Sequence, residues 1–159
     1  MRKMYGLLSA LLIVSVLLTG CLGGGTEVDE RKDAEEAITA LLNKYAKTFH
    51  RDPEAHAALF YAYPFEVTVG RGGSAGRETM ETPDEFIELL EEAGWNPDRP
   101  TSLEIDGTPD ITFDDNYKTA VVEVKIILTS GQTVPYTRDV KYVNNTWLLS
   151  TPIVGIFVN

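Results

Sequence analysis

Cysteine and histidine are scarce in this chain of 159 residues, which has one cysteine and two histidines. A single thiol cannot form an intramolecular disulfide or a thiolate metal site, so the hydrophobic core alone has to stabilise the fold. His50 and His56 are separated by a spacing that does not bring two side chains to one face of a helix. We therefore expect no metal site and no cofactor.

Positive charge is scarce as well. The chain has 14 Lys and Arg residues against 24 Asp and Glu residues, and its formal net charge is −10 at pH 7. Binding to nucleic acid needs clustered basic side chains, so nucleic acid is not expected as a partner. An acidic surface is also repelled by anionic lipid head groups, so attachment to a membrane would require a lipid anchor.

The chain also lacks an apolar run long enough to span a bilayer. Residues 4–18 are mostly apolar, follow two basic residues and precede Thr19-Gly20-Cys21. A buried helix or a transmembrane anchor is the alternative, but a spanning helix needs ~20 apolar residues. The pattern is typical of a lipoprotein signal peptide. We expect residues 1–20 to be removed and Cys21 to carry acyl chains of the palmitate type, which tether the protein to the cell membrane outside the cytoplasm.

The remainder of the chain is expected to form one domain. The glycine-rich stretch ending at Val28 predicts a flexible spacer over residues 21–28. Residues 29–159 then have the length of a single domain with a complete core. Because the removed segment carries two basic residues and no acid, the formal charge becomes −12 in the mature chain.

Three helices are expected in the first half of this domain. A first helix over residues 29–50 is predicted by apolar residues at steps of three and four. Asp52-Pro53 predicts the start of a second helix that runs to about Phe60, and Thr82-Pro83 the start of a third that ends at Gly94. The apolar positions of the first helix are Ala34, Ile38, Leu41, Tyr45 and Phe49.

Strands are expected elsewhere. Alternating apolar residues predict a strand over residues 61–69, followed by a glycine-rich hairpin tip at residues 70–76. Beyond Trp95, four runs separated by turn residues predict an antiparallel meander. These runs are residues 103–113, 117–128, 133–143 and 147–158. We expect Tyr45, Phe65 and Trp147 in the core.

This element order resembles the nuclear transport factor 2-like (NTF2-like) and ketosteroid isomerase-like superfamily. The residues that fit are Leu41, Leu42 and Tyr45 of the leading helix, the strand of residues 61–69, and a terminal strand opened by Trp147. The resemblance implies an α+β fold, in which three helices from the N-terminal half pack on a curved, mostly antiparallel sheet shaped like a cone. A cystatin-type helix and sheet is the other fold considered. Members include enzymes and non-catalytic binding domains, so this fold leaves the function open.

Arg138 is the residue most out of place in this pattern. It alternates with Val134, Tyr136, Val140 and Tyr142, so it should share their inward face. A buried guanidinium needs a carboxylate, from the protein or from an acidic ligand. A bulge near Pro135 or a position at the sheet rim would turn it outward instead. We predict a ligand site with Arg138, Tyr45, Tyr63 and Tyr136.

Other residues carry weaker signals. His56 could act as a base in a pocket, although a lone histidine on a helix is more often structural. The loop of residues 71–77 lacks a phosphate-binding motif, and Asp110, Asp114 and Asp115 lack calcium-loop spacing. Asn144-Asn145-Thr146 matches the glycosylation sequon at Asn144.

Two functions are compatible with these observations. The first is a membrane-anchored lipoprotein whose domain binds a small apolar or acidic ligand, or a partner such as a second copy of the chain. The second is a small isomerase or lyase without a cofactor. The enzyme needs a carboxylate or His56 within hydrogen-bond reach of a tyrosine inside the cavity, whereas a binding domain can have a filled or apolar interior. We favour the binding domain.

Overall fold

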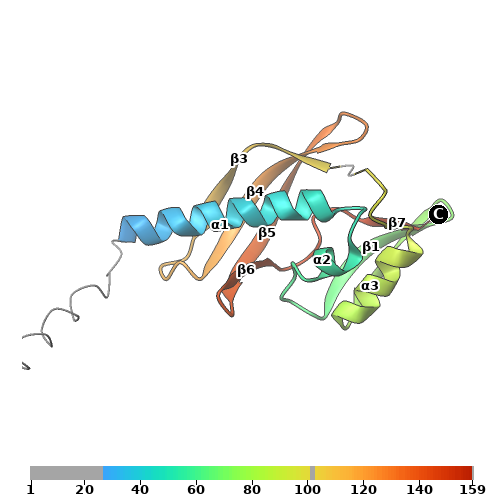
Figure 1. Ribbon diagram of the computed structural model, residues 1–159, viewed down its shortest axis with the longest axis horizontal. Coiled ribbons are helices and arrows are strands. Elements are labelled where there is room, and N and C mark those ends of the chain that lie inside the picture. The colour runs from blue at the N-terminus through green and yellow to red at the C-terminus, as the bar shows by residue number, and fades with distance from the viewer. Residues whose placement is uncertain (1–26, 101–102, 159) are drawn as a thin grey trace, which may run out of the picture.

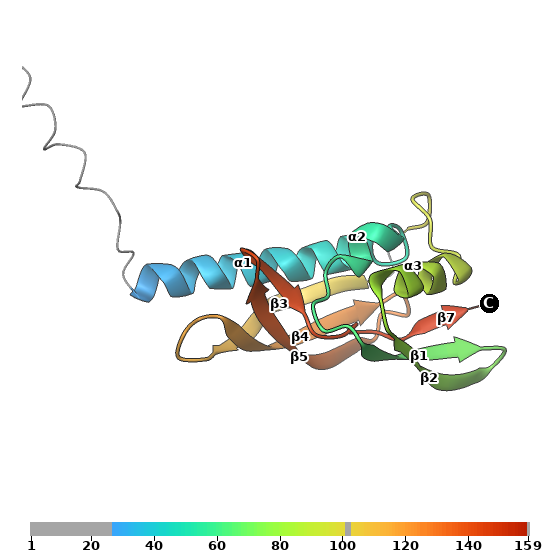
Figure 2. The same ribbon diagram turned by 90° about the horizontal axis from the view of Figure 1, so that it is seen from below.

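The structure is a computed structural model that describes residues 27–100 and 103–158. Its helices form one layer and its strands another (Figures 1 and 2). The expected signal peptide and Cys21 lie outside the described residues, so the statements about them stay predictions. No helix among the described residues is long and apolar enough to cross a bilayer.

Helix α1, Glu27–Thr48, is the long helix that the apolar period predicts, and it begins two residues earlier than expected. Acidic residues in its first turn suit the positive end of the helix dipole. Its buried side, which includes Ile38, Leu42 and Tyr45, packs mainly on strands β3 and β6 of the larger sheet. His50 has a φ of 65°, so the helical conformation has ended there.

Helices α2, Pro53–Ala57, and α3, Pro83–Glu92, begin at the predicted caps. The Asp52 carboxylate accepts a hydrogen bond from the Ala55 N–H at 2.9 Å, and the Thr82 hydroxyl accepts one from Glu85 at 3.3 Å. Helix α2 ends at Ala57 rather than near Phe60, because Phe60 forms a bridge with Leu149 of the larger sheet.

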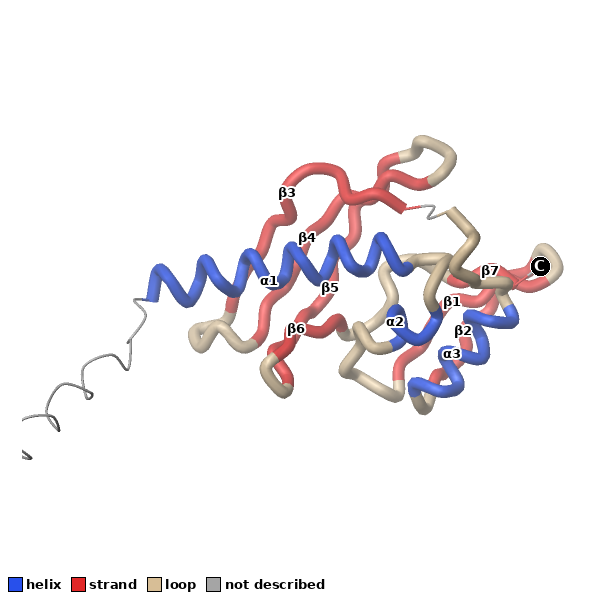
Figure 3. Tube along the Cα trace, viewed as in Figure 1, coloured by secondary structure: helices blue, strands red, loops and turns tan. Residues whose placement is uncertain are grey.

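The larger sheet is the predicted antiparallel meander, with its strands hydrogen-bonded in the order β3-β4-β5-β6 (Figure 3). Its buried face, with Val122, Val124 and Ile126 of β4, lies toward the helices. Gly107, with a φ of 75°, lies where the register of β3 shifts against β4. The strands are β3, Leu103–Phe113; β4, Thr119–Leu128; β5, Thr133–Val143; and β6, Thr146–Leu149.

The smaller sheet has the order β2-β1-β7, and each of its three strands differs from prediction. Strand β1, Phe65–Arg71, starts later than the expected residue 61, because Pro64 has no N–H to donate to a ladder. The expected tip of residues 70–76 contains the start of β2, Ser74–Met80, after a turn at Gly72 and Gly73 with φ of 56° and 84°.

The expected terminal strand of residues 147–158 is wrong as a single element. It is divided into β6 and β7, Ile156–Val158, and β7 pairs in parallel with β1 in the other sheet. Between them, residues 150–155 form a connector that contains Pro152. A proline removes a ladder donor, which favours the break.

The predicted core and fold class are confirmed. Tyr45 is 0% exposed, and Phe65 and Trp147 are each 5% exposed. The architecture is α+β, with helices of the N-terminal half packed on antiparallel-rich sheets. The strands form two hydrogen-bonded sheets rather than one, and the parallel β1–β7 pair belongs to the smaller sheet.

Candidate functional site

Arg138 lies on the face that its alternating pattern predicts. The β4–β5 register runs without a bulge and pairs Val122 with Arg138 and Val124 with Tyr136. Arg138 is half-buried, as is Tyr136, and Val140 on the same face is buried. The bulge considered near Pro135 is therefore absent from this pairing.

The Arg138 guanidinium meets backbone carbonyls where the sequence suggested a carboxylate. Its Nε and Nη2 each donate to the Pro152 carbonyl at 3.1 Å, and Nη2 also donates to the Ile153 carbonyl at 3.2 Å. Its Nη1 donates to the Thr137 carbonyl at 2.6 Å. The forked geometry of the guanidinium allows it to bind several carbonyls of the connector at once.

Tyr45 binds the same connector from the helix side. Its hydroxyl oxygen accepts hydrogen bonds from the N–H groups of Ile153, at 3.0 Å, and Val154, at 3.2 Å. Burial raises the pKa of Tyr45 far above its usual value, while these two N–H groups and the Arg138 charge act in the opposite direction. The hydroxyl therefore stays protonated across the physiological range.

We call Tyr45, Arg138 and residues 152–154 the connector clamp. In it, one side chain accepts from two N–H groups of the connector and the other donates to two of its carbonyls. Ile153 is 2% exposed, so the chain itself occupies the space beside Tyr45 and Arg138. Tyr136 lies beside Arg138, whose guanidinium carbon is 5.7 Å from the centroid of the Tyr136 ring. The binding of a ligand by these residues stays a prediction.

His56 lies beside Tyr45 of this cluster, whereas Tyr63 packs against Phe65, with ring centroids 4.7 Å apart. The Tyr63 hydroxyl donates to the Ala57 carbonyl at 3.4 Å, a long contact, and burial raises the pKa of Tyr63. His56 is 0% exposed, with its Nδ1 2.8 Å from the Thr48 hydroxyl oxygen and its ring centroid 4.5 Å from that of Tyr45. Burial lowers the pKa of His56 to about 3, so the ring is neutral at pH 7.

The described interior does not contain the acid–base pair that an isomerase would need. The hydrogen-bond partners of Tyr45 and Tyr63 are backbone groups, and that of His56 is a threonine hydroxyl. Among residues 27–100 and 103–158, no group of three His, Cys, Asp or Glu side chains could hold a metal ion.

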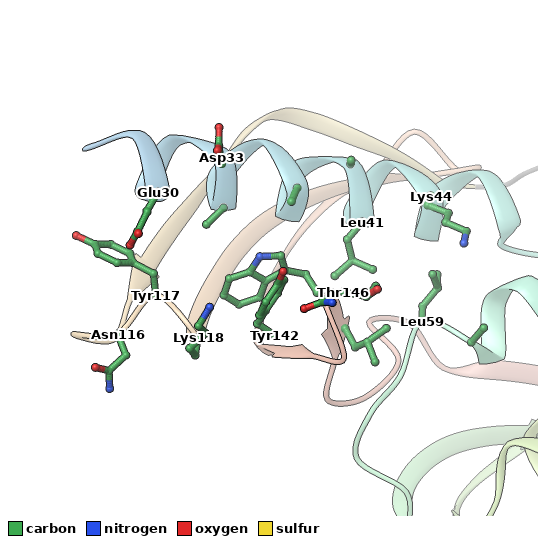
Figure 4. Close-up of a pocket in the computed structure, with 17 residues that line it drawn as sticks. Glu30, Asp33, Leu41, Lys44, Leu59, Asn116, Tyr117, Lys118, Tyr142 and Thr146 are labelled. Carbon is green, nitrogen blue, oxygen red and sulfur yellow. The ribbon is translucent and has the colours of Figure 1, made fainter. Parts of the chain in front are cut away.

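An open groove of about 880 Å³ lies elsewhere, between α1 and the hairpin of β5 and β6 (Figure 4). We call it the α1–β6 groove. Ala34, Ala37, Ala40 and Leu41 line it from the helix, Tyr142 and Trp147 from the sheet, and Leu59 from the segment after α2. Its volume is within the usual range for pockets that bind small molecules.

The segment after α2 is fixed to the outer edge of β6. The Leu149 N–H donates to the Leu59 carbonyl at 2.7 Å, and the Tyr61 N–H donates to the Leu149 carbonyl at 3.0 Å. Leu59 is therefore held beside β6 by backbone hydrogen bonds, at the end of the groove where Lys44 also lies (Figure 4).

Lys118 is the cation on the sheet side of the groove. Asp114 fixes the turn before β4, because its Oδ1 accepts from the N–H groups of Lys118, at 3.0 Å, and Thr119, at 3.2 Å. These hydrogen bonds lower the pKa of Asp114. The ammonium of Lys118 lies 4.4 Å from the centroid of the Tyr142 ring, a cation–π contact. Asp114 is thus a turn residue, as predicted.

Trp147 contributes an unpaired donor to the groove wall. It is 5% exposed, and the described residues include no hydrogen-bond partner for its indole Nε1–H. The only fully buried side-chain N or O atom without a partner in the described part is Nε2 of His56. The indole N–H is therefore accessible from the groove.

The sequence did not predict this groove, because its residues come from four segments that are distant in the chain. The alanines of α1 and the position of Trp147 next to a turn are the signals that could have indicated it. Asn144 and Asn145, with φ of 48° and 65°, form that two-residue turn between β5 and β6. Asn144 is exposed, and its glycosylation stays a prediction.

Comparison with known proteins identifies the fold. No protein-family model and no curated protein sequence match the chain. An NTF2-like protein of unknown function from Silicibacter pomeroyi has a TM-score of 0.50 and 17% identity, over 75% of this chain and 92% of that one. A cystatin-like fold protein from Burkholderia xenovorans has a TM-score of 0.51 and 15% identity, over 77% and 97%. The chain therefore has the fold shared by NTF2-like and cystatin-like proteins.

Proposed function

We propose that this chain is an extracytoplasmic lipoprotein, anchored by lipid on Cys21, whose folded domain binds a small ligand in the α1–β6 groove. The proposal for the anchor rests on the sequence pattern that ends at Cys21. The proposal for the groove rests on the geometry of the folded domain and on a fold that hosts binding domains.

One observation carries the choice of the groove. Two of its polar groups, the Lys118 ammonium and the Trp147 indole N–H, have no hydrogen-bond or ion-pair partner among the described residues. In the connector clamp, by contrast, the Tyr45 and Arg138 side chains are already bound to backbone groups. Free polar groups in an apolar concave site are what orient a ligand.

Native mass spectrometry of the purified chain tests the groove. We expect a small-molecule adduct on the wild-type protein that is lost in Ala37→Trp, because an indole at this groove-lining position fills the space. Asn43→Trp is the matched control, since Asn43 is exposed on α1 and does not line the groove. An adduct retained in Ala37→Trp would place the ligand elsewhere. Its absence from all three proteins would contradict small-ligand binding.

The anchor is tested independently by replacing Cys21 with Ser. We expect the variant to leave the membrane fraction or to keep its unprocessed mass, because no thiol remains for acylation. Thr19→Ser is the control and should behave as the wild type. An unchanged mass and unchanged membrane association in Cys21→Ser would contradict the anchor and leave the proposal for the groove intact.

A further inference from the structure

The charges that line the α1–β6 groove are unevenly placed. Lys118 holds its ammonium over the Tyr142 ring, and no described carboxylate forms an ion pair with it. Lys118 is exposed, and the Tyr142 ring contacts its ammonium from one side. The polar group best placed to receive a ligand is therefore a cation.

The groove also has acidic residues, and their positions limit their effect. Asp33 directs its carboxylate away from the aromatic side chains, whereas Glu30 directs its carboxylate toward Tyr117 at one end of the groove (Figure 4). The Tyr117 hydroxyl at this end already donates to Glu27 at 3.1 Å. Lys44, the second cation, is exposed at the opposite end, beyond Leu41.

Between these ends, apolar side chains and the polar Thr146 line the groove (Figure 4). Ala37, Ala40 and Leu41 of α1 face Leu59 and the ring of Tyr142 across it. Small side chains on the helix leave an elongated space parallel to its axis rather than a round cavity. A ligand that fills this space needs an extended apolar part next to its charged group.

We infer that the α1–β6 groove binds a fatty-acid-type amphiphile, with its single anionic group at Lys118 and its chain along the alanines of α1. This inference rests on the proposed function, because it names the class of ligand for the same groove. The indole N–H of Trp147 supplies a further donor for the polar part of the ligand. The acyl chain covers Leu41 and Leu59.

Three probes with the same chain length test the charge of the ligand. Dodecanoate, dodecyltrimethylammonium and dodecyl maltoside are titrated into the purified chain by calorimetry, below their micelle concentrations and without detergent. Dodecanoate is expected to bind at least tenfold more tightly than either of the others. Equal affinities for the three probes, or preference for the cationic one, would overturn the inference.

Variants locate the head group. Lys118→Met keeps an apolar side chain of similar length and should weaken dodecanoate at least tenfold, with little change for the maltoside. Lys47→Met is the control, because Lys47 is exposed on α1 outside the groove. Ala37→Trp should weaken dodecanoate and the maltoside together. An unchanged dodecanoate affinity in Lys118→Met would remove Lys118 from the site.

The same experiments separate this inference from the proposed function. If no probe binds but the wild-type chain carries an adduct that Ala37→Trp loses, the groove is a ligand site and the fatty-acid class is wrong. If no probe binds and no such adduct is found, both the inference and the proposed function fail. Circular dichroism of each variant establishes that the compared proteins are folded.

Discussion

The connector clamp and the α1–β6 groove use similar residue types in opposite ways. Both combine an aromatic residue with a basic one: Tyr45 with Arg138 in the clamp, and Tyr142 with Lys118 in the groove. In the clamp, the polar atoms are bound to the backbone of residues 152–154. In the groove, the face of the ring is the only partner of the ammonium among the described residues.

This difference separates structural residues from candidate binding residues. The alternating pattern of residues along the strand favoured Arg138 as the binding residue, because an arginine on an apolar face is unusual. The contacts show that its hydrogen-bonding capacity is used to hold the connector. A polar group is a better candidate for binding when it borders open space and has no partner, as at Lys118 and Trp147.

The largest expected effect is on the wall that the groove shares with the core. Trp147→Ala should lower the free energy of unfolding by about 3 to 5 kcal/mol, because a buried indole is replaced by a cavity. The ring packs against Tyr142, with centroids 5.6 Å apart, and Phe113, at 6.1 Å. Urea denaturation measures the change. A loss below about 1 kcal/mol would show that the ring stabilises the core little and belongs to the groove alone.

The second prediction concerns the clamp. Tyr45→Phe removes the oxygen that accepts from Ile153 and Val154 and should destabilise the protein by about 2 to 4 kcal/mol, because two N–H groups lose their acceptor. Tyr142→Phe, at a half-buried tyrosine of the groove, is the comparison and should cost much less. Similar losses in the two variants would contradict the distinction between clamp and groove.

The other half of the clamp should contribute less, because the Arg138 side chain is only half-buried. Arg138→Met is expected to cost about 1 to 3 kcal/mol through the loss of donors to Pro152 and Ile153. Arg138→Lys should recover part of this loss, since an ammonium can reach one carbonyl but cannot bridge both. If Arg138→Met no longer binds dodecanoate and its free energy of unfolding is unchanged, Arg138 binds the ligand rather than holding the connector.

His56, next to Tyr45, makes the interior sensitive to acid. Its pKa is lowered by burial to about 3, from 6.5, so the unfolded chain takes up a proton that the native protein does not. The contribution of neutral His56 to the free energy of unfolding is therefore complete above pH 6.5, and it decreases as the pH falls from 6.5 to about 3. Between pH 7.5 and 5 the wild type should lose about 2 kcal/mol more than His56→Gln.

Urea denaturation at the two pH values gives this difference directly. The amide of His56→Gln can still bond to Thr48, so the variant removes the titration while it keeps a polar partner for the hydroxyl. His50, whose pKa burial lowers to about 4, is present in both proteins and its contribution cancels. Parallel pH profiles for the two proteins would show that His56 does not titrate in this range.

The smallest effect on stability is expected in the groove. Lys118→Met should change the free energy of unfolding by less than about 0.5 kcal/mol, since the ammonium has no carboxylate partner among the described residues. Thermal or urea denaturation measures it. A large loss would mean that Lys118 stabilises the turn before β4 and would weaken its assignment to a ligand.

Local sequence patterns predicted most of the elements. The helix caps at Asp52 and Thr82 and the meander with turns at residues 114–116, 130–131 and 144–145 are set by neighbouring residues, and these were found. Strand β2 was missed because Ser74–Met80 is mostly exposed and has no alternating apolar face. Only its pairing with β1 makes it a strand.

The site depended on contacts that no local pattern contains. The face of Arg138 followed from alternation in β5, whereas its partners belong to a connector that was expected to be part of a strand. The groove requires α1, the turn before β4 and the β5–β6 hairpin to be placed together. Pro152 is the residue in this segment that indicates a break between strands, because a proline has no N–H to donate to a ladder.

The separation along the chain between Tyr45 and its two donors has a consequence for folding. The donors lie 108 and 109 residues after Tyr45, and β7 likewise has to reach back to β1. Helix α1 emerges from the ribosome well before the residues that satisfy its buried hydroxyl. Contacts of such high sequence separation favour slow, late closure of the fold. Chains that stop short of Ile153 would leave the buried hydroxyl of Tyr45 without these donors. We therefore expect the clamp to form only in chains that extend past Val154.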